Sequence, residues 1–257
     1  MRKHAYIPDT QIKPGVKIDH LYAAGRYLGE HLNPGDLLML AGDWYDMNSL
    51  SSYDEPGSFE WESKDLEEDF ESGREGLDVF KQGFDDSKKG LWKKLDKRVT
   101  MGNHENRAKR VRESALFRRF RSALSDDNFA FREYGFRIYP FLHMAAINGV
   151  VYSHYLVNPQ GLTGNPIGGT IQNKLNKIKC SFTMGHQQGL DSGMQHLATG
   201  KRIRGLVAGS FYQHNEQYMG PQKNLQHWRG IIVKHEVRSG DYDLMEVSMR
   251  YLLKNWT

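Results

Sequence analysis

Cysteine is almost absent from this chain of 257 residues, and its scarcity excludes two kinds of protein. Cys180 is the single cysteine, so neither an internal disulfide framework nor a cysteine-rich metal site can form. Such cysteine usage is typical of a reducing compartment, and we expect a cytoplasmic protein. Cys180 itself is expected to be a small buried side chain rather than a nucleophile.

Long hydrophobic runs are absent as well. None of the apolar segments approaches the roughly 18 residues that a membrane span requires, so we expect no membrane partner. Hydrophobic residues make up 39% of the chain and charged residues 26%, which is typical of a globular protein. The length suits one large α/β domain, and neither a repeat nor a linker divides it. We therefore expect a single domain over residues 1–257.

Polar clusters follow short apolar segments, and the clearest case is Leu37 to Asp46. An apolar run of strand length ends there at Gly42 and continues with Asp43 and Asp46. Buried strands of layered α/β folds are continuous apolar runs, and ligands collect where such strands end. Glycine permits a sharp turn that presents Asp43 at the end of the strand. Taken alone, however, a Gly-Asp pair marks an ordinary turn more often than a metal site.

Four further segments repeat this arrangement. The polar groups that follow an apolar run are Asp9-Thr10-Gln11, Gly102-Asn103-His104-Glu105, His154 and Gly185-His186-Gln187-Gln188. Each of them could be a strand end, a turn or a core histidine. Together they supply oxygen and nitrogen ligands without a thiolate, which favours a metal site at one edge of a sheet.

The order of these motifs resembles that of the calcineurin-like metallophosphoesterases, which carry D-x-H, GDxxD, GNH(D/E), H and GHxH. The resemblance runs from Asp9 to Gln188, and GNHE combined with GDxxD is its most specific part. It implies a four-layer αββα sandwich, and the alternation of strand-like and helix-like segments is typical of such an α/β fold.

The resemblance also implies an enzyme, a metal-dependent phosphoric ester hydrolase. Two divalent cations roughly 3.5–4 Å apart would activate a water for in-line attack on phosphorus. The implied ligands are Asp9, Gln11 and Gln188 at the first site, Asn103, His154 and His186 at the second, and Asp43 as the bridge. His104 is implied as the general acid that protonates the leaving oxygen, and Asp46 as the residue that orients it.

One departure from the family pattern concerns the first site. Gln11 and Gln188 stand where the family has histidine, and both histidines serve the same metal. Amide oxygens make that site harder and weaker, so we expect manganese, with magnesium, zinc and iron as alternatives. The first site could instead fill only when substrate phosphate completes it, or His196 or His214 could replace the missing imidazoles.

Several elements are predicted along the chain. We expect a helix from Asp19, as its N-cap, to about His31, and a hairpin turn at Asn148-Gly149. Residues 47–97 are predicted to be a charged helical insertion, whose first part is acidic and whose second part is basic. A pair of solvated helices is the preferred interpretation, with Phe70, Leu77 and Phe80 packed inward; a cap over the site or a dimer contact is the alternative. Strands are expected again at Gly205–Ala208, Ile231–Val237 and Leu244–Met249.

A basic segment follows the GNHE motif. Its cations are Arg107, Lys109, Arg110, Arg112, Arg118, Arg119 and Arg121. It could be a helix that follows a phosphate backbone, or a solvated helix whose arginine stems cover a neighbour. Arg107 and Arg110 lie nearest the motif and are the expected substrate contacts.

The predicted function is a phosphodiesterase or nuclease that acts on nucleic acid, similar to the nuclease subunits of double-strand-break repair complexes. A net charge of +4 and a pI near 9.0 permit a polyanionic partner without requiring one. The C-terminal part resembles compact members of the family, including phage-encoded ones. The alternatives are hydrolysis of a small phosphoester (a cyclic nucleotide, a phosphomonoester or a phosphoprotein side chain) and a catalytically idle metal-binding module.

Overall fold

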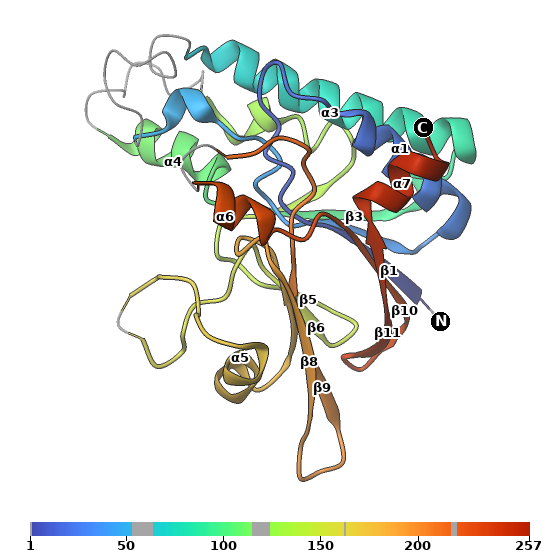
Figure 1. Cartoon of the computed structure of the whole chain (residues 1–257), viewed down its shortest axis with the longest axis vertical. Helices are drawn as coiled ribbons and strands as arrows, with labels where there is room; N and C mark the ends of the chain where they lie inside the picture. The colour runs from blue at the N-terminus through green and yellow to red at the C-terminus, as the bar shows by residue number, and fades with distance from the viewer. Residues whose placement is uncertain (1, 53–63, 115–123, 162, 217–219) are drawn as a thin grey trace.

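The structure is a computed structural model that describes residues 2–52, 64–114, 124–161, 163–216 and 220–257. Within these ranges the chain forms two mixed β-sheets and six α-helices (Figure 1). The predicted α/β class is confirmed, and the two sheets with their helices are compatible with an α/β sandwich. None of the described helices is both long and apolar enough to cross a membrane.

The first sheet has six strands in the order β11-β10-β1-β2-β3-β4. Their bounds are β1 Arg2–Ile7, β2 Leu37–Leu40, β3 Asp96–Thr100, β4 Arg137–Tyr139, β10 Gly230–Arg238 and β11 Asp241–Ser248. β1 to β4 are mutually parallel, and β10 and β11 are antiparallel additions. Since parallel strands end at the same edge of a sheet, the polar segments after β1, β2 and β3 meet there.

The second sheet has five strands in the order β5-β6-β7-β9-β8. Their bounds are β5 Ala145–Ile147, β6 Val150–Tyr152, β7 Ser181–Met184, β8 Leu190–His196 and β9 Arg202–Ala208. The hairpin turn predicted between β5 and β6 is confirmed, with positive φ at Asn148 (50°) and Gly149 (85°). β6 and β7 are parallel, so the segments that carry His154 and His186 leave the sheet at the same edge.

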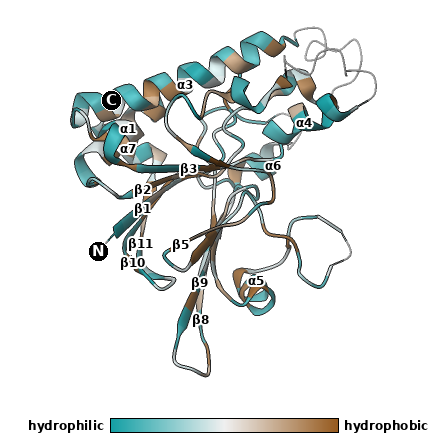
Figure 2. Cartoon of the chain, turned by 180° about the vertical axis from the view of Figure 1, so that it is seen from behind, coloured by the Kyte–Doolittle hydropathy of each residue, from teal (hydrophilic) through white to brown (hydrophobic). Residues whose placement is uncertain are grey.

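Three apolar clusters hold the elements together. The helices are α1 Asp19–His31, α3 Leu66–Ser87, α4 Glu105–Glu113, α5 Ile171–Ile178, α6 Gly220–Leu225 and α7 Met249–Asn255. α1, α3 and α7 share a cluster with one face of the first sheet, and α5 shares another with the second sheet. The third cluster contains residues of both sheets, such as Tyr6 and Leu206, and therefore lies between them. Figure 2 shows hydrophobic residues along the central strands and on part of α5.

Some predicted elements differ from the observed ones. α1 has the expected range, but its N-cap is Ile18 without a side-chain cap, so Asp19 is the first helical residue and the cap prediction was wrong. The expected helix pair is replaced, in the described part of residues 47–97, by the single long helix α3 and two short 3-10 turns, Asn48–Leu50 and Trp92–Lys94; residues 53–63 lie outside the described part.

Helix α3 is the crossover between the parallel strands β2 and β3 rather than a solvated addition. It packs along α1, with Leu77 and Phe80 fully buried and Phe70 partly buried. The inward packing of these three side chains is confirmed. A crossover helix covers the sheet because the connection must return across one of its faces.

Candidate metal centre

Glu105 fixes the loop that carries Asp43. Its buried carboxylate accepts four backbone hydrogen bonds, from the N–H groups of Asp43, Trp44, Tyr45 and Gly102, at 2.7 to 3.1 Å. One carboxylate therefore joins the loop after β2 to the loop after β3 and sets their separation. The sequence analysis assigned Glu105 no role, because motif spacing carries no information about which backbone groups a carboxylate will meet.

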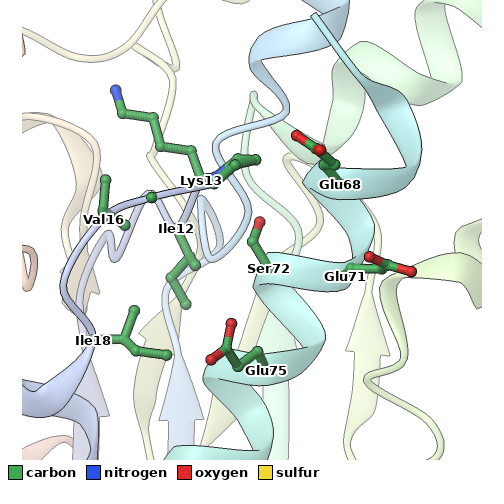
Figure 3. Close-up of a pocket in the computed structure, with 10 residues that line it drawn as sticks. Ile12, Lys13, Val16, Ile18, Glu68, Glu71, Ser72 and Glu75 are labelled. Carbon is green, nitrogen blue, oxygen red and sulfur yellow. The ribbon is translucent and has the colours of Figure 1, made fainter.

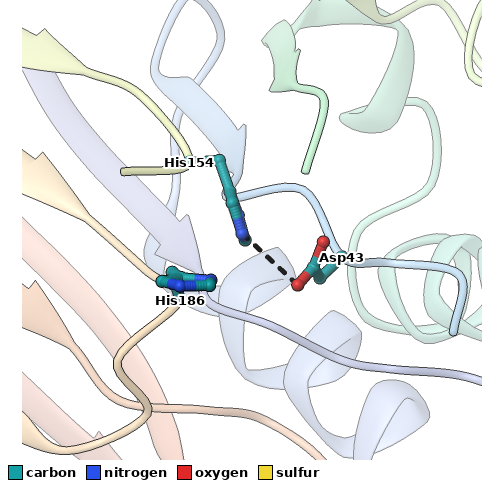
Figure 4. Close-up of side chains that lie close together, drawn as sticks. All are labelled: Asp43, His154 and His186. Carbon is teal, nitrogen blue, oxygen red and sulfur yellow. Dashed lines mark ion pairs between the residues drawn. The ribbon is translucent and has the colours of Figure 1, made fainter. Parts of the chain in front are cut away.

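Asp43, His154 and His186 converge at this edge of the sheets (Figure 4). Their ligand atoms all lie within 4.8 Å of one another. His154 donates from Nδ1 to the carbonyl oxygen of Ala41 at 3.0 Å, which directs Nε2 toward Asp43 Oδ2 at 3.3 Å and Asn103 Oδ1 at 2.9 Å. Metal-binding histidines are oriented in the same way, by a hydrogen bond from the other ring nitrogen. The group could therefore hold a divalent cation.

The electrostatics of this group are set by burial and by close charges. Burial alone would raise the pKa of Asp43, but the imidazoles of His104 and His154 hold it below its usual range. Burial alone would lower the pKa of His154, but the Asp43 and Asp9 carboxylates raise it to about 9. Burial and the charge of His154 lower the pKa of His186 to about 4. One imidazole is thus paired with a carboxylate and the other is neutral at pH 7.

Asp9 lies beside the same group, at the end of β1. It is fully buried, and both of its carboxylate oxygens accept a hydrogen bond from the backbone N–H of His186 at 3.0 Å. Burial, and secondarily the charge of Asp43, raise the pKa of Asp9 to about 7. The contact requires Gly185, since a Cβ there would lie 2.3 Å from Asp9 Oδ1.

The two glutamines have different surroundings. Gln11 is buried, and its Oε1 has no hydrogen-bond partner within the described part of the chain. Gln188 is buried too, but its Oε1 accepts a hydrogen bond from the Tyr212 hydroxyl at 2.8 Å. An unsatisfied buried acceptor is costly unless something binds it. Gln11 therefore has an acceptor free for a cation, whereas that of Gln188 is already engaged.

Four of the predicted ligands have a left-handed backbone. The residues are Gln11 (φ 43°), Asp43 (φ 48°), His186 (φ 65°) and Gln188 (φ 58°). Positive φ is uncommon outside glycine and carries a conformational cost, and such residues gather at functional sites. Their concentration at one edge of the sheets, together with the free acceptor of Gln11, fits a site built to hold cations.

His104 and Asp46 form a buried pair next to Asp43. His104 Nδ1 lies 2.8 Å from Asp46 Oδ1, and Nε2 lies 3.7 Å from Asp43 Oδ2. Burial alone would lower the pKa of His104, but Asp43 and Asp46 raise it. Burial alone would raise the pKa of Asp46, but the hydrogen bond and charge of His104 lower it to about 2. Asp46 thus orients an imidazole whose protonated form is favoured.

The pair of His104 and Asp46 is linked through ion pairs to Lys13, Glu216 and His214, and the sequence did not predict these contacts. Lys13 Nζ lies 3.3 Å from Asp46 Oδ2 and 3.2 Å from Glu216 Oε1, and Glu216 Oε1 lies 2.7 Å from His214 Nε2. His214 is therefore bound to Glu216. His196 lies exposed at the end of β8, which runs outward from the turn that carries Gln188 (Figure 1). The alternative that one of these histidines replaces a missing imidazole stays a prediction, and the buried Nδ1 of His214, which has no hydrogen-bond partner within the described part of the chain, makes it the stronger candidate of the two.

The two expected substrate arginines differ in position. Arg107 is largely buried: it donates to the carbonyl oxygens of Asp46 (2.8 Å) and Met47 (3.2 Å), and its Nη2 lies 3.3 Å from His104 Nε2. Arg110 is exposed on α4.

The rest of the basic segment is only partly described. Lys109 pairs with Glu113 at 3.9 Å, and Arg112 with Asp126 at 3.1 Å. Arg118, Arg119 and Arg121 lie outside the described residues. Within the described part of α4, Arg107 is thus the arginine that reaches the pair of His104 and Asp46.

Two cavities lie near these residues. One, of about 450 Å³, is lined by His186 and Gln188. The other, of about 410 Å³, lies between residues 12–18 and α3, where Glu68, Glu71 and Glu75 line it opposite the apolar side chains of that segment (Figure 3). Three acidic residues of α3, Glu68, Glu71 and Glu75, therefore line the cavity next to residues 12–18.

Comparison with known proteins assigns no family. No protein-family model matches the chain, and no curated protein is significantly similar to it.

Proposed function

We propose that this protein is a divalent-metal-dependent phosphodiesterase of the calcineurin-like metallophosphoesterase type, acting on nucleic acid. The observation that carries the proposal is the convergence of Asp43, His154 and His186, with His104 held by Asp46 against the same carboxylate. A cation-binding group next to an oriented imidazole is the arrangement that phosphoester hydrolysis requires. In this proposal, the two sheets and the helices on their outer faces are the four layers of an αββα sandwich.

The residues fit two cations of unequal affinity. Asp43, Asn103, His154 and His186 would hold one, and Asp9, Gln11 and Gln188 would hold the other with Asp43 shared. Bound divalent cations would supply the Lewis acidity that activates a water and neutralises charge on the phosphate. Hard oxygen ligands on the second set favour manganese or magnesium over zinc there.

The protein groups around the cations would position the substrate and move a proton. His104 Nε2 would donate the proton to the leaving oxygen, since Nδ1 is held by Asp46. Arg107, 3.3 Å from the same Nε2, would place a fixed positive charge beside a phosphate oxygen. Lys13 would keep Asp46 ionised and in place through their ion pair.

A comparison of substrate classes tests the proposal. Single- and double-stranded DNA, RNA, a cyclic nucleotide and a phosphomonoester would be offered to the protein under Mn²⁺. We expect a nucleic-acid phosphodiester to be hydrolysed fastest, with a rate that falls steeply as salt is added, because contacts between cationic side chains and phosphates release counterions. The alternative, a small-molecule phosphoesterase, predicts that the cyclic nucleotide or the monoester is fastest. Cation binding without hydrolysis of any substrate would indicate an idle metal-binding module.

A further inference from the structure

The cavity of about 450 Å³ shares the side chain of His186 with the candidate metal centre. His186 belongs both to the converging ligand group and to the cavity wall, and Gln188 lines it as well. The rest of the wall comes from the turn after β7, the loop before α5, helix α5, the start of β8, the end of β9 and helix α6. If a substrate phosphorus atom lies at the candidate metal centre, a nucleoside esterified to it is therefore long enough to reach this cavity.

Two charged side chains of the wall are bound within the protein. The ammonium group of the buried Lys174 donates to the carbonyl oxygen of Gly169, and the carboxylate of the half-buried Asp191 accepts a hydrogen bond from the backbone N–H of Ile171 at 2.9 Å. The wall also offers a ligand the apolar side chain of Leu190 and the amide of Gln187. The wall thus suits a flat group with apolar faces and polar edges rather than a highly charged one.

Gln187 is fixed as well. Its Nε2 donates to the carbonyl oxygen of Ile167 at 3.0 Å, which leaves Oε1 as an acceptor for a ligand N–H group. Lys223, an exposed cation of α6, also lines the cavity and could meet an adjacent phosphate. The volume lies within the roughly 300–1,000 Å³ of small-ligand sites. Apolar stacking surface, an amide acceptor and a cation together match a nucleotide.

We propose that this cavity receives the base of the nucleotide that remains attached to the scissile phosphorus. A base paired inside a duplex cannot enter such a cavity without leaving its stack. The preferred substrate is therefore single-stranded nucleic acid or an unpaired terminal nucleotide. This inference rests on the proposed function and specifies its substrate.

Two esters with the same leaving group test the inference in the unaltered protein. Thymidine 5′-(4-nitrophenyl phosphate) and methyl 4-nitrophenyl phosphate differ only in the group that stays on phosphorus. Removal of about 60 Å² of base surface from water at about 25 cal/mol per Å² is worth roughly tenfold, so KM for the thymidine ester should be about tenfold lower under Mn²⁺. Equal KM values for the two esters would overturn the inference.

Gly189 offers a way to fill the cavity with little disturbance of the fold. It lines the cavity, and a Cβ there would meet no atom closer than the Gln187 carbonyl oxygen at 4.0 Å. Gly189→Leu should bring the ratio of the two KM values, measured within the variant, close to one. Gly164→Leu is the matched control: Gly164 is exposed, a Cβ there would meet no atom within 4 Å, and the residue does not line the cavity. Gly164→Leu should change the KM of neither ester. An undiminished preference for the thymidine ester in Gly189→Leu would contradict the inference.

A binding measurement separates this inference from the proposed function. Calorimetric titration with thymidine 5′-monophosphate and with methyl phosphate, both with Mn²⁺, requires no turnover. If the nucleotide binds about tenfold more tightly than methyl phosphate, and Gly189→Leu removes this difference, the proposed role of the cavity is supported even if no ester is hydrolysed. Equal affinities for the two phosphates refute the proposed binding of a base in the cavity, even if both esters are hydrolysed. If Gly189→Leu does not fold, the KM values of the two esters and the two titrations, all measured on the unaltered protein, still test whether the cavity binds a base.

Discussion

The two halves of the proposed metal centre differ in how far their candidate ligands are preorganised. We call Asn103, His154 and His186 the histidine side, and Asp9, Gln11 and Gln188 the glutamine side, with Asp43 between them. On the histidine side, the hydrogen bond from His154 Nδ1 to Ala41 presents Nε2 to Asp43. On the glutamine side, Gln11 Oε1 is free but Gln188 Oε1 is held by Tyr212.

The difference between the histidine side and the glutamine side shows that the number of candidate ligands and their preorganisation are separate properties. Each side has three side chains, yet one amide oxygen of the glutamine side already accepts a hydrogen bond from Tyr212, which leaves it one lone pair for a cation and draws electron density away from it. A neutral amide oxygen is also a weaker ligand than an imidazole nitrogen for most divalent transition metals. We therefore expect one tightly and one weakly bound cation.

Replacing Asp43 should have the largest effect, because both sides share it. Asp43→Asn should lower hydrolysis by on the order of 10³-fold or more and weaken cation binding on both sides. Asparagine tolerates the left-handed backbone of this position better than alanine does, so the fold should be preserved. Elemental analysis would count the bound cations. Two full equivalents in the variant would show that Asp43 does not bridge the sides.

Replacing His104 should separate proton donation from cation binding. His104→Asn should slow esters with poor alkoxide leaving groups by roughly 10²- to 10⁴-fold. A 4-nitrophenyl ester should be affected much less, because its leaving group needs no proton. Cation affinity on both sides should stay within a few-fold. If both kinds of ester lose rate equally, His104 positions phosphate instead of donating a proton.

The pH dependence of cation binding should differ between the sides. His154, with a pKa of about 9, and Asp9, with a pKa of about 7, must each lose a proton before they can bind a cation. Affinity on each side therefore rises with pH until the pKa of that residue is passed. Between about pH 7 and 9 it should rise by up to roughly tenfold per unit on the histidine side and remain flat on the glutamine side. Anaerobic calorimetric titration with Mn²⁺ would measure this, and parallel curves for the two sides would contradict it.

The sequence predicted the position of the site better than its internal contacts. Asp9, Asp43 and His154 each follow an apolar run, and runs of strand length define strand ends without knowledge of partners. The contacts of Glu105 with the loop after β2, and of Tyr212 with Gln188, join residues 24 to 62 positions apart. No periodicity or spacing encodes which of many side chains meets which backbone group.

Missed secondary structure has a similar physical origin. β8 has the sequence Leu-Asp-Ser-Gly-Met-Gln-His and is an edge strand with alternating exposure, so it lacks the apolar run that marks a buried strand. Helices α5 and α7 have eight and seven residues, too few for a clear helical period. These elements form because the sheet next to them provides an apolar face to cover.

Converting the glutamine side into a histidine side should have a smaller effect. Gln11→His combined with Gln188→His should tighten zinc binding there by roughly tenfold, since imidazole is the better ligand for zinc. The histidine at position 188 would also lose the hydrogen bond from Tyr212, which limits the gain. Competitive titration of zinc against manganese measures the shift. Unchanged affinities would show that these two positions are not ligands.

The unequal occupancy of the two sides can be measured directly by anomalous scattering from a crystal soaked in a low concentration of Mn²⁺. We predict a strong peak among the ligand atoms of Asp43, His154 and His186, and a weaker peak on the side of Asp9 and Gln11 that grows as the Mn²⁺ concentration rises. Peaks of equal height at low concentration, a stronger peak on the glutamine side, or no peak at either side would contradict this account of the centre.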